Sequence, residues 1–236
     1  MRTLSLVIIS AFVLMSFTPG KPLSVQKKKK GWISLFNGKS TQGWHSYGKT
    51  AAGNSWKVKD GLLYLDASNK SEPRDGGDLV TDQAFENFHL KLEWKISQNG
   101  NSGVIFWLQD EPAKYQQVWH TGPEMQVLDN DGHPDGKIKK HRAGNLYDLV
   151  EGTEGAVKPV GEWNTAEIIS DRGTLKFFLN GINTVTTQYG DDNWRQMIAG
   201  SKFKIRPDFG KNFKGHLALQ DHGNDVWFRN IVIKKL

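Results

Sequence analysis

Residues 88–96 read Phe-His-Leu-Lys-Leu-Glu-Trp-Lys-Ile, so apolar and polar side chains alternate along the whole stretch. Side chains of a β-strand point alternately to the two faces of a sheet. The alternation therefore predicts a strand with one face in a hydrophobic core and the other in water. Helical periodicity is nearly absent after residue 30, which indicates a fold built from strands.

Other short alternating stretches lie on both sides of this one and are separated by turn residues. Trp56-Lys57-Val58-Lys59 and Leu62-Leu63-Tyr64-Leu65 flank Asp60-Gly61, a pair typical of tight hairpins. We expect further strands at residues 103–108, 124–128, 166–170, 175–179, 215–220 and 226–233, and a short helix at 193–199. Many short strands at regular spacing predict an all-β sandwich or jelly roll rather than βαβ units.

The first 30 residues differ from the rest of the chain. Arg2 precedes an apolar run from Leu4 to Phe17, which predicts a secretory signal peptide over residues 1–20. The run is shorter than the roughly 20 residues that span a bilayer, although an uncleaved membrane anchor is the alternative. Lys27 to Lys30 indicate a basic linker over residues 21–30. We therefore expect an exported protein, periplasmic or extracellular, with a single domain over residues 31–236 and no integral membrane span after cleavage.

Charge and cysteine content exclude several classes of protein. Six of the 31 Lys and Arg residues precede Gly31, so 25 basic residues balance 25 acidic ones in the expected domain. Nucleic-acid binding needs a basic folded surface, so we expect no nucleic-acid partner. The absence of cysteine rules out disulfides, thiolate metal sites and a lipidated cysteine.

One strand carries a candidate binding face next to a turn. If the strand at 103–108 extends back to Asn101, its alternate residues fall on two faces. The core face contains Val104, Phe106 and Leu108, and the opposite face contains Asn101, Gly103, Ile105 and Trp107. Asn101 and Trp107 are then candidates for contacts with a ligand. A turn Asn beside a Trp at the sheet edge is the structural alternative.

Two further strands present polar residues opposite their core face. Met125 and Val127 are expected in the core, so Glu124 and Gln126 point the other way. Leu217 and Leu219 take the core face of their strand, and Ala218, Gln220 and His222 share the opposite one. Carboxylates and amides bind sugar hydroxyls well, and His is a common general base. A solvated outer face and a structural His at a strand end are the alternatives.

The long, polar segment 132–161 is a candidate functional loop, because long loops in compact domains often serve function. It contains several polar and titratable residues close together in the sequence, namely His133, Asp135, His141, Arg142, Asn145, Tyr147 and Asp148. His and Asp bind divalent metal ions, so such an ion is a candidate cofactor. The spacing matches no particular metal motif, and we assign no metal ligand.

Several stretches taken together resemble the 3-keto-disaccharide hydrolase domain family, long described as a domain of unknown function. They occur in family order from about residue 31 to the end of the chain, at Leu35-Phe36-Asn37-Gly38-Lys39, Gly43-Trp44, residues 56–63, Asn101-Ser102-Gly103, residues 124–130, Gly161-Glu162-Trp163-Asn164, Leu179-Asn180-Gly181, residues 219–223 and residues 226–231. Trp107 departs from the pattern, since many relatives carry Arg there. The resemblance implies a concanavalin-A-like jelly roll of two antiparallel sheets with a sugar-binding concave face.

The resemblance also implies an enzyme that cleaves glycosides whose sugar carries a ketone at C3. The ketone acidifies the hydrogen on C2, so a base can remove it, the C1 group leaves by elimination, and water then adds. We expect His222 as the base, with Glu124 as the second candidate. Asn101 and Gln126 are expected to bind the substrate, together with Trp107, Gln220, and His141, Arg142 and Tyr147 from the loop. A hydrogen-bond donor or a metal ion would stabilise the enolate oxygen.

Two alternatives keep the carbohydrate ligand and change the chemistry. Retaining glycosidases resembling laminarinases carry E-x-D-x-x-E on a strand, and Glu124, Gln126 and Asp129 have that spacing as E-x-Q-x-x-D. The other alternative is a carbohydrate-binding module or lectin without catalytic activity, for which aromatic and amide side chains suffice.

Overall fold

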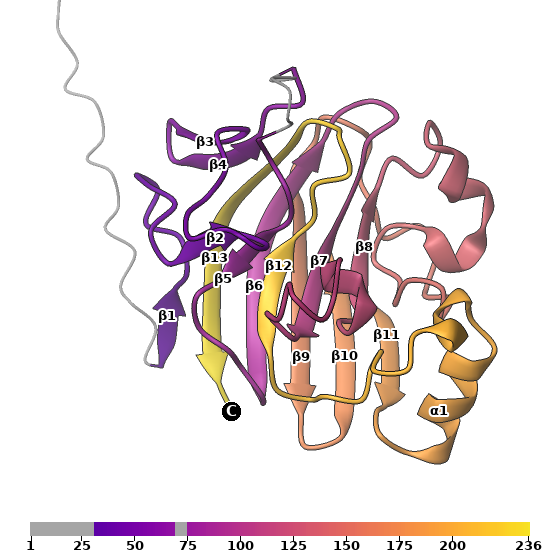
Figure 1. Ribbon diagram of the computed structural model, residues 1–236. Helices are drawn as coiled ribbons and strands as arrows, with labels where there is room; N and C mark the ends of the chain where they lie inside the picture. Colours follow the sequence, from indigo (N-terminus) through magenta and orange to yellow (C-terminus); the bar gives the residue numbers. More distant parts are fainter. Residues whose placement is uncertain (1–30, 69–74) are drawn as a thin grey trace, which may run out of the picture.

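The structure, a computed structural model, describes residues 31–68 and 75–236, so the predicted signal peptide and basic linker lie outside the described residues. Two antiparallel sheets pack face to face (Figure 1). Within the described residues, the larger sheet has eight strands in the order β11-β10-β9-β6-β13-β4-β3, with β1 paired to β13. The smaller has five, in the order β2-β5-β12-β7-β8. The prediction of an all-β, jelly-roll sandwich is confirmed.

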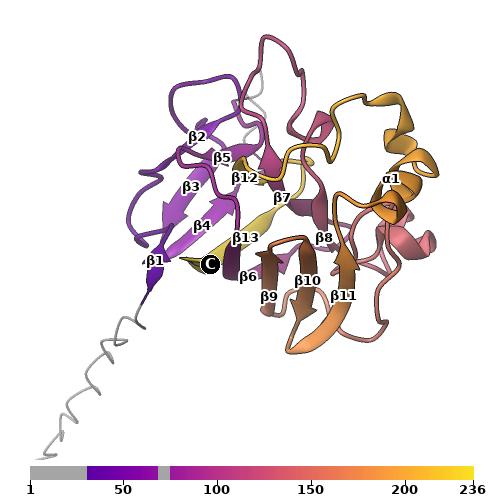
Figure 2. The ribbon, with the colours of Figure 1, turned by 90° about the horizontal axis from the view of Figure 1, so that it is seen from below.

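The strands of the larger sheet are short to medium in length and come from both ends of the chain. Their bounds are β1 Trp32–Ser34, β3 Trp56–Lys59, β4 Leu62–Leu65, β6 Phe88–Ile96, β9 Asn164–Asp171, β10 Thr174–Leu179, β11 Ile182–Gln188 and β13 Val226–Lys235. Those of the smaller sheet are β2 Trp44–Ser46, β5 Leu79–Thr81, β7 Asn101–Leu108, β8 Glu124–Leu128 and β12 His216–Leu219. Figure 2 shows β11 and β3 toward opposite edges of the larger sheet.

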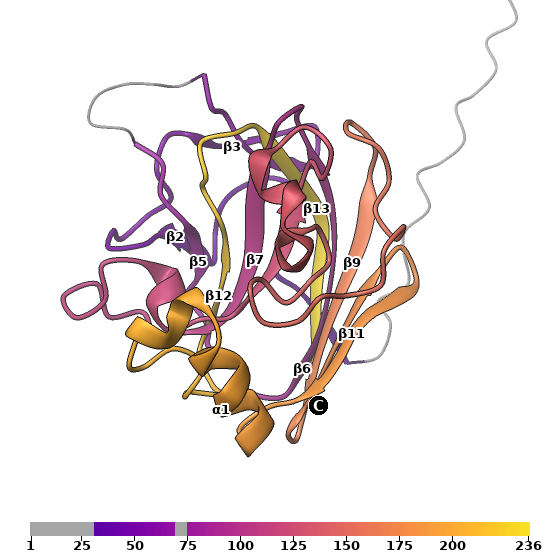
Figure 3. The same cartoon turned by 90° about the vertical axis from the view of Figure 1, so that its right-hand side faces the viewer.

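Strict alternation along β6 places one face of the strand between the two sheets. Phe88, Leu90, Leu92, Trp94 and Ile96 are all buried in the main core, and the polar residues between them are partly exposed. Burying that many large apolar side chains is the main term that holds such a sandwich together. Figure 3 shows the two layers separately, with β7 and β12 in one and β13 and β9 in the other.

Residues with a left-handed backbone make hairpin turns, one of them at Asp60-Gly61, where the sequence predicts it. Asp60 and Gly61 have φ of 51° and 77°, and Asn180 and Gly181 have φ of 51° and 83°. Positive φ at both central residues gives the turn twist that matches paired strands, and Asn, Asp and Gly adopt it at least cost. These turns fix the registers of β3 with β4 and of β10 with β11.

The predicted faces of β7 are correct as far as Phe106 and wrong for Trp107 and Leu108, because a bulge interrupts the alternation. Ile105 pairs with Ala218 and Leu108 pairs with His216, so β7 has one more residue than β12 between these two pairs. Trp107 takes up the extra residue with φ of 57°. The bulge turns the Trp107 side chain into the main core and puts Leu108 into a smaller cluster on the outer face.

Short helices lie in several of the connections between strands. The 3-10 helices are η1 Val118–His120, η2 Pro134–Lys137, η3 Lys139–His141 and η4 Lys202–Ile205, and the α-helix is α1 Asp192–Ala199. Asp191 caps α1 by accepting a hydrogen bond from the backbone N–H of Trp194, which confirms the helix predicted near residues 193–199. In the part of the chain that is described, no helix has the length and apolar character needed to cross a membrane.

Candidate active site

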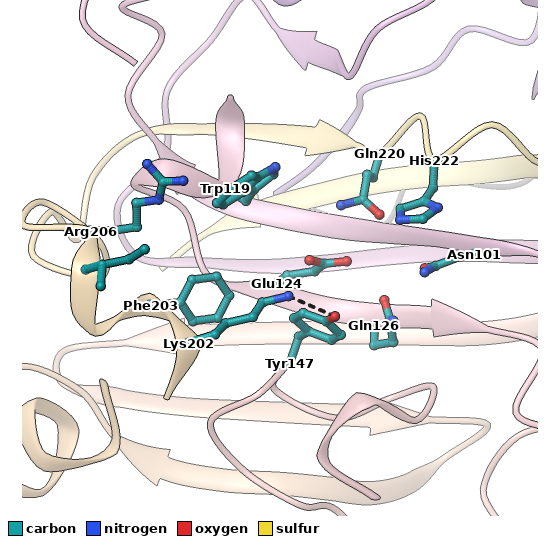
Figure 4. A pocket seen from close by; sticks show the side chains of 11 residues that line it. Asn101, Trp119, Glu124, Gln126, Tyr147, Lys202, Phe203, Arg206, Gln220 and His222 are labelled. Atoms are coloured by element: carbon teal, nitrogen blue, oxygen red, sulfur yellow. Dashed lines mark hydrogen bonds between the residues drawn. The ribbon is translucent and has the colours of Figure 1, made fainter. Parts of the chain in front are cut away.

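A pocket of about 390 Å³ lies on the face of the smaller sheet that points away from the core. This volume falls in the range of roughly 300–1,000 Å³ typical of small-molecule sites. The lining residues come from β7, β8, the end of β12, η1, η4 and the long loop, and they are Asn101, Trp119, Glu124, Gln126, Tyr147, Lys202, Phe203, Ile205, Arg206, Gln220 and His222 (Figure 4). Six of the nine residues predicted from the sequence therefore meet in one pocket: Asn101, Glu124, Gln126, Tyr147, Gln220 and His222.

The long loop forms part of the pocket because it runs along the exposed edge of β8. The backbone N–H of Gly144 donates to the carbonyl of Gln126, and the N–H of Tyr147 donates to the carbonyl of Glu124. These bonds satisfy backbone groups that an edge strand would otherwise leave unpaired. They also place the Tyr147 ring beside the Glu124 side chain.

Glu124 lies at the centre of the pocket, and its residue surface is only 5% exposed. Among the described residues, no group donates a hydrogen bond to its carboxyl oxygens. Burial raises the pKa of Glu124 to about 8, against the opposing charge of Lys202 and with smaller contributions from Asp78 and Asp135. A carboxyl in this state holds its proton at neutral pH and can donate it.

A hydrogen-bonded chain holds one wall of the pocket. Lys202 Nζ donates to the Tyr147 hydroxyl oxygen at 2.9 Å, and that hydroxyl donates to Asp135 Oδ2 at 2.9 Å. Burial and the bond to Asp135 raise the pKa of the Tyr147 phenol well above its usual range. Tyr147 therefore stays protonated, and Lys202 brings a positive charge close to the centre of the pocket.

His222 follows β12 and stands at the mouth of the pocket. It is exposed, and its ring lies 6.0 Å from the ring of His133, edge to face. Partial desolvation lowers the pKa of His222, and repulsion from His133 lowers it further, while Asp135 acts in the opposite direction. The imidazole is therefore mostly neutral at pH 7 and can accept a proton.

Three amide side chains line the same region as His222. Asn101 is 3% exposed, and its Oδ1 is buried without a hydrogen-bond partner among the described residues. Buried polar atoms in native proteins are nearly always paired, so an unpaired atom in a pocket points to a ligand group that completes it. Gln126 and Gln220 also line the pocket, and Figure 4 shows the three amides near His222.

The structure places His141 and Arg142 outside the pocket. The ring of His141 lies against that of Tyr147, with 4.3 Å between the ring centres and a tilt of 34°, and its Nε2 lies 2.9 Å from Asp148 Oδ1, so His141 lies behind the pocket wall. Arg142 Nε donates to the carbonyl of Gly136, and its guanidinium pairs with Glu154. Neither side chain reaches the pocket lining, which corrects the expectation that both complete the site.

Trp107 also lies away from the pocket, because the bulge in β7 directs it inward. Its residue surface is 0% exposed, and its ring packs against Phe106, Tyr189 and Phe213 at 4.8, 4.7 and 5.4 Å. A fully buried side chain cannot contact a substrate, so the binding role expected for Trp107 is wrong. Its role is to fill the core.

Five pocket residues were not expected from the sequence, namely Trp119, Lys202, Phe203, Ile205 and Arg206. They belong to η1 and η4 or follow η4 directly, where no periodicity marks a face. The weak local signal is Ser201, whose hydroxyl accepts a hydrogen bond from the Phe203 N–H and so begins η4.

The described residues contain no group of three or more His, Asp or Glu side chains arranged to hold a metal ion. His133 and Asp135 lie near His222 together with the three amides, but these groups form no such set of ligands. We therefore derive no step through a metal ion, and a divalent metal ion as cofactor stays a prediction.

Comparison with known proteins places this sandwich and pocket in one family. Residues 31–234 match the 3-keto-alpha-glucoside-1,2-lyase-like domain. The chain belongs to this family. The family resemblance read from the sequence blocks is thereby confirmed, and the 3-keto-alpha-glucoside-1,2-lyase-like domain spans nearly all of the described chain.

The relatives of this 3-keto-alpha-glucoside-1,2-lyase-like domain cover most of its length. A Bacteroides thetaiotaomicron protein named 3-keto-disaccharide hydrolase is 36% identical over 228 residues, which are 87% of this chain and 79% of the relative. A solved structure from Parabacteroides distasonis, provisionally assigned as a glycosyl hydrolase, is 32% identical with a TM-score of 0.80 and covers 91% of this chain and 98% of that one. A second structure from the same organism, with the same assignment, is 26% identical with a TM-score of 0.65, over 87% and 99% of the two chains.

Proposed function

We propose that this protein is a carbohydrate-cleaving enzyme that acts on 3-keto-glycosides by proton abstraction at C2, elimination and hydration. The family match and the name of the Bacteroides relative support this activity. The observation that carries the mechanism is the pairing, in one pocket, of a neutral His222 with a protonated Glu124. Two titratable groups whose pKa values are displaced in opposite senses are typical of a base and an acid in one site.

The reaction consumes one water and returns every proton. His222 takes the proton from C2, and the electron pair of the C–H bond forms an enolate with the C3 ketone. The enolate collapses to restore the ketone and form the C1–C2 double bond, and the C1–O bond breaks as Glu124 protonates the departing oxygen. Glu124, now a carboxylate, takes a proton from a water molecule as the water oxygen adds to C1, and His222 gives its proton back to C2. The free 3-keto sugar forms and both residues regain their starting protonation states. This route needs no pair of carboxylates around the glycosidic oxygen.

Asn101 and Gln126 would support the negative charge that develops on the ketone oxygen, because their amide groups line the same end of the pocket as His222. The order of candidates for the base, His222 before Glu124, agrees with the protonation states described above.

The retaining-glycosidase alternative is weakened by the surroundings of Asp129. Its carboxylate accepts hydrogen bonds from the backbone N–H groups of Asn99, Asp131 and Gly132, so it holds a turn. It does not belong to the pocket lining, whereas retaining enzymes place two carboxylates about 5–5.5 Å apart around the bond they cleave.

A chromogenic 3-keto-glucoside, assayed beside its unoxidised parent with and without a chelator, tests the proposed function. We expect turnover of the keto substrate alone. Cleavage of the parent would support the glycosidase alternative, and binding without turnover of either would support a binding module. Loss of activity with chelator, restored by a divalent ion, would establish the metal cofactor.

The base is tested by His222→Ala, for which we expect turnover to fall by about 10²-fold or more. His89→Ala is a matched control, since His89 lies on the outer face of the larger sheet and pairs with Glu167. Near-normal turnover of His222→Ala would remove His222 from the mechanism.

We also propose that the enzyme is exported through cleavage near residue 20, on the strength of the sequence of residues 1–20. Expression in a Gram-negative host, followed by fractionation and mass spectrometry of the mature N-terminus, tests this. A full-length protein kept in the membrane fraction would instead support the uncleaved anchor.

A further inference from the structure

The two ends of the pocket differ in chemistry. Figure 4 shows Asn101, Gln126 and His222 toward one end, Glu124 in the middle, and Phe203 and Arg206 toward the other. The first end offers amide groups that can both donate and accept hydrogen bonds, as a sugar requires. If the keto sugar occupies that end, the group attached to its C1 must lie toward η4.

Ile205 stands out at this second end. It lines the pocket, yet 69% of its surface is exposed, the largest exposed fraction of any large apolar side chain in the described part of the chain. Single exposed apolar residues are common on protein surfaces, but one that lines a pocket provides apolar contact area for a ligand.

The neighbours of Ile205 form a firm, mostly apolar wall. Phe203 is stacked on Phe209 at 3.9 Å and meets the Tyr147 ring at 6.4 Å, so its ring is held from two sides. The guanidinium of Arg206 lies 4.9 Å from the centre of the Trp119 ring and covers one of its faces.

The polar side chains at this end are hydrogen-bond donors. Arg206 and the indole of Trp119 have N–H groups and no acceptor atom, and the Lys202 ammonium, which lies nearer the centre of the pocket, has none either. A second sugar placed here could use its hydroxyl oxygens as acceptors, but its hydroxyl hydrogens would find no side-chain acceptor at this end. An apolar group carries no such requirement.

We infer that Ile205, Phe203, Trp119 and Arg206 form the aglycone subsite, and that this enzyme takes 3-keto-glycosides with an apolar or aromatic aglycone in preference to 3-keto-disaccharides. The inference rests on the proposed function and narrows its substrate class. Ile205 is the specificity-determining residue, because contact with its side chain buries more apolar surface of an apolar aglycone than of a hydroxylated one.

Two synthetic substrates with leaving groups of similar reactivity test the inference. They are the 3-keto-glucosides of cyclohexylmethanol and of glucose attached through its 6-hydroxyl, both primary alcohols. We expect kcat/KM of the wild-type enzyme to favour the cyclohexylmethyl substrate by about tenfold. Ile205→Ser should reduce that ratio by about fivefold, through the substrate with the apolar aglycone.

Ile205→Leu and Ile182→Ser are the matched controls. Ile205→Leu keeps the apolar side chain and should keep the ratio. Ile182 is 42% exposed at the start of β11 and does not line the pocket, so Ile182→Ser should leave both rates unchanged. A preference for the glucose-linked substrate, or an unchanged ratio in Ile205→Ser, would overturn the inference alone. Turnover of neither substrate by the wild-type enzyme would overturn the proposed function and the inference with it.

Discussion

Gly103 lies directly under the carboxyl group of Glu124. A Cβ atom at residue 103 would overlap Glu124 Oε1 and come within 2.8 Å of its Cγ. The two residues sit on adjacent strands, where Ile105 pairs with Glu124 and Gly103 pairs with Gln126. The Glu124 side chain therefore lies across the sheet in space that only glycine leaves open, and this explains how a carboxyl group is buried at the centre of the pocket.

Gly103→Ala should displace the Glu124 carboxyl while leaving the fold intact. The three nearest atoms that the new methyl group would meet all belong to the Glu124 side chain, which can rotate away. We expect kcat/KM on a 3-keto-glucoside to fall by about 10–100-fold, because small displacements of a catalytic group are costly. Steady-state kinetics and a thermal melt measure the two effects.

The double variant Gly103→Ala, Glu124→Gln provides the control for this effect. If Gly103 acts through Glu124, the double variant should be no slower than Glu124→Gln alone. A further loss in the double variant would mean that Gly103 is needed for another reason, such as direct contact of the substrate with the strand.

The pH dependence of kcat/KM should reveal His222 and Glu124 as a base and an acid. Activity should rise with pH through the pKa of His222, which lies below the usual value, and fall through about pH 8 as Glu124 loses its proton. Glu124→Gln should lose about 10²-fold or more with an alkyl aglycone, which needs protonation as it leaves. With a 4-nitrophenyl aglycone, which leaves as a stable anion, the loss should be small and the fall near pH 8 should disappear. Activity that rises through pH 8 would instead make Glu124 the base.

Glu124 should also destabilise the folded protein as pH increases. Its pKa is about 8 in the folded state against an ordinary value of 4.5, so the folded state binds more protons between these pH values, and stability contributed at this site falls as pH rises through that window. Glu124→Gln should therefore gain roughly 2–4 kcal/mol relative to the wild type between pH 5 and pH 8. Urea unfolding at both pH values measures the difference, and an equal offset at the two would contradict the raised pKa.

Trp107→Ala should affect stability and leave catalysis unchanged. Truncating a fully buried aromatic side chain costs about 3–5 kcal/mol, and Trp107 contacts three aromatic rings in the core. We expect a large drop in the urea midpoint, with kcat/KM per folded molecule close to the wild-type value. An unchanged urea midpoint together with a raised KM would instead indicate that Trp107 contacts the substrate.

The part of the site that follows from the sequence is the part carried by regular strands. Glu124 and Gln126 could be placed opposite Met125 and Val127 because the period of two holds from Glu124 to Val127. Gln220 and Asn101 follow by the same reasoning. The prediction succeeds because a strand with one buried face must send its remaining side chains to the other.

The rest of the site depends on contacts that no local pattern encodes. Trp107 was misplaced because nothing in the sequence marks the bulge, which has no glycine at the residue with positive φ. Phe203 and Arg206 reach the pocket because Asp148 accepts a hydrogen bond from the backbone N–H of Lys202, across 54 residues of sequence, and this contact docks η4 beside the loop.

The bulge divides β7 into two parts, and the sequence and register of one part can change while those of the other stay the same. From Asn101 to Ile105, β7 pairs with β8 without interruption, and the extra residue is taken up only after that point. The connection between β7 and β8 can therefore gain, lose or exchange residues without shifting Asn101, Glu124 or Gln126 out of register. Trp119 lies in that connection, so one wall of the pocket can diverge among relatives while the catalytic strands stay aligned.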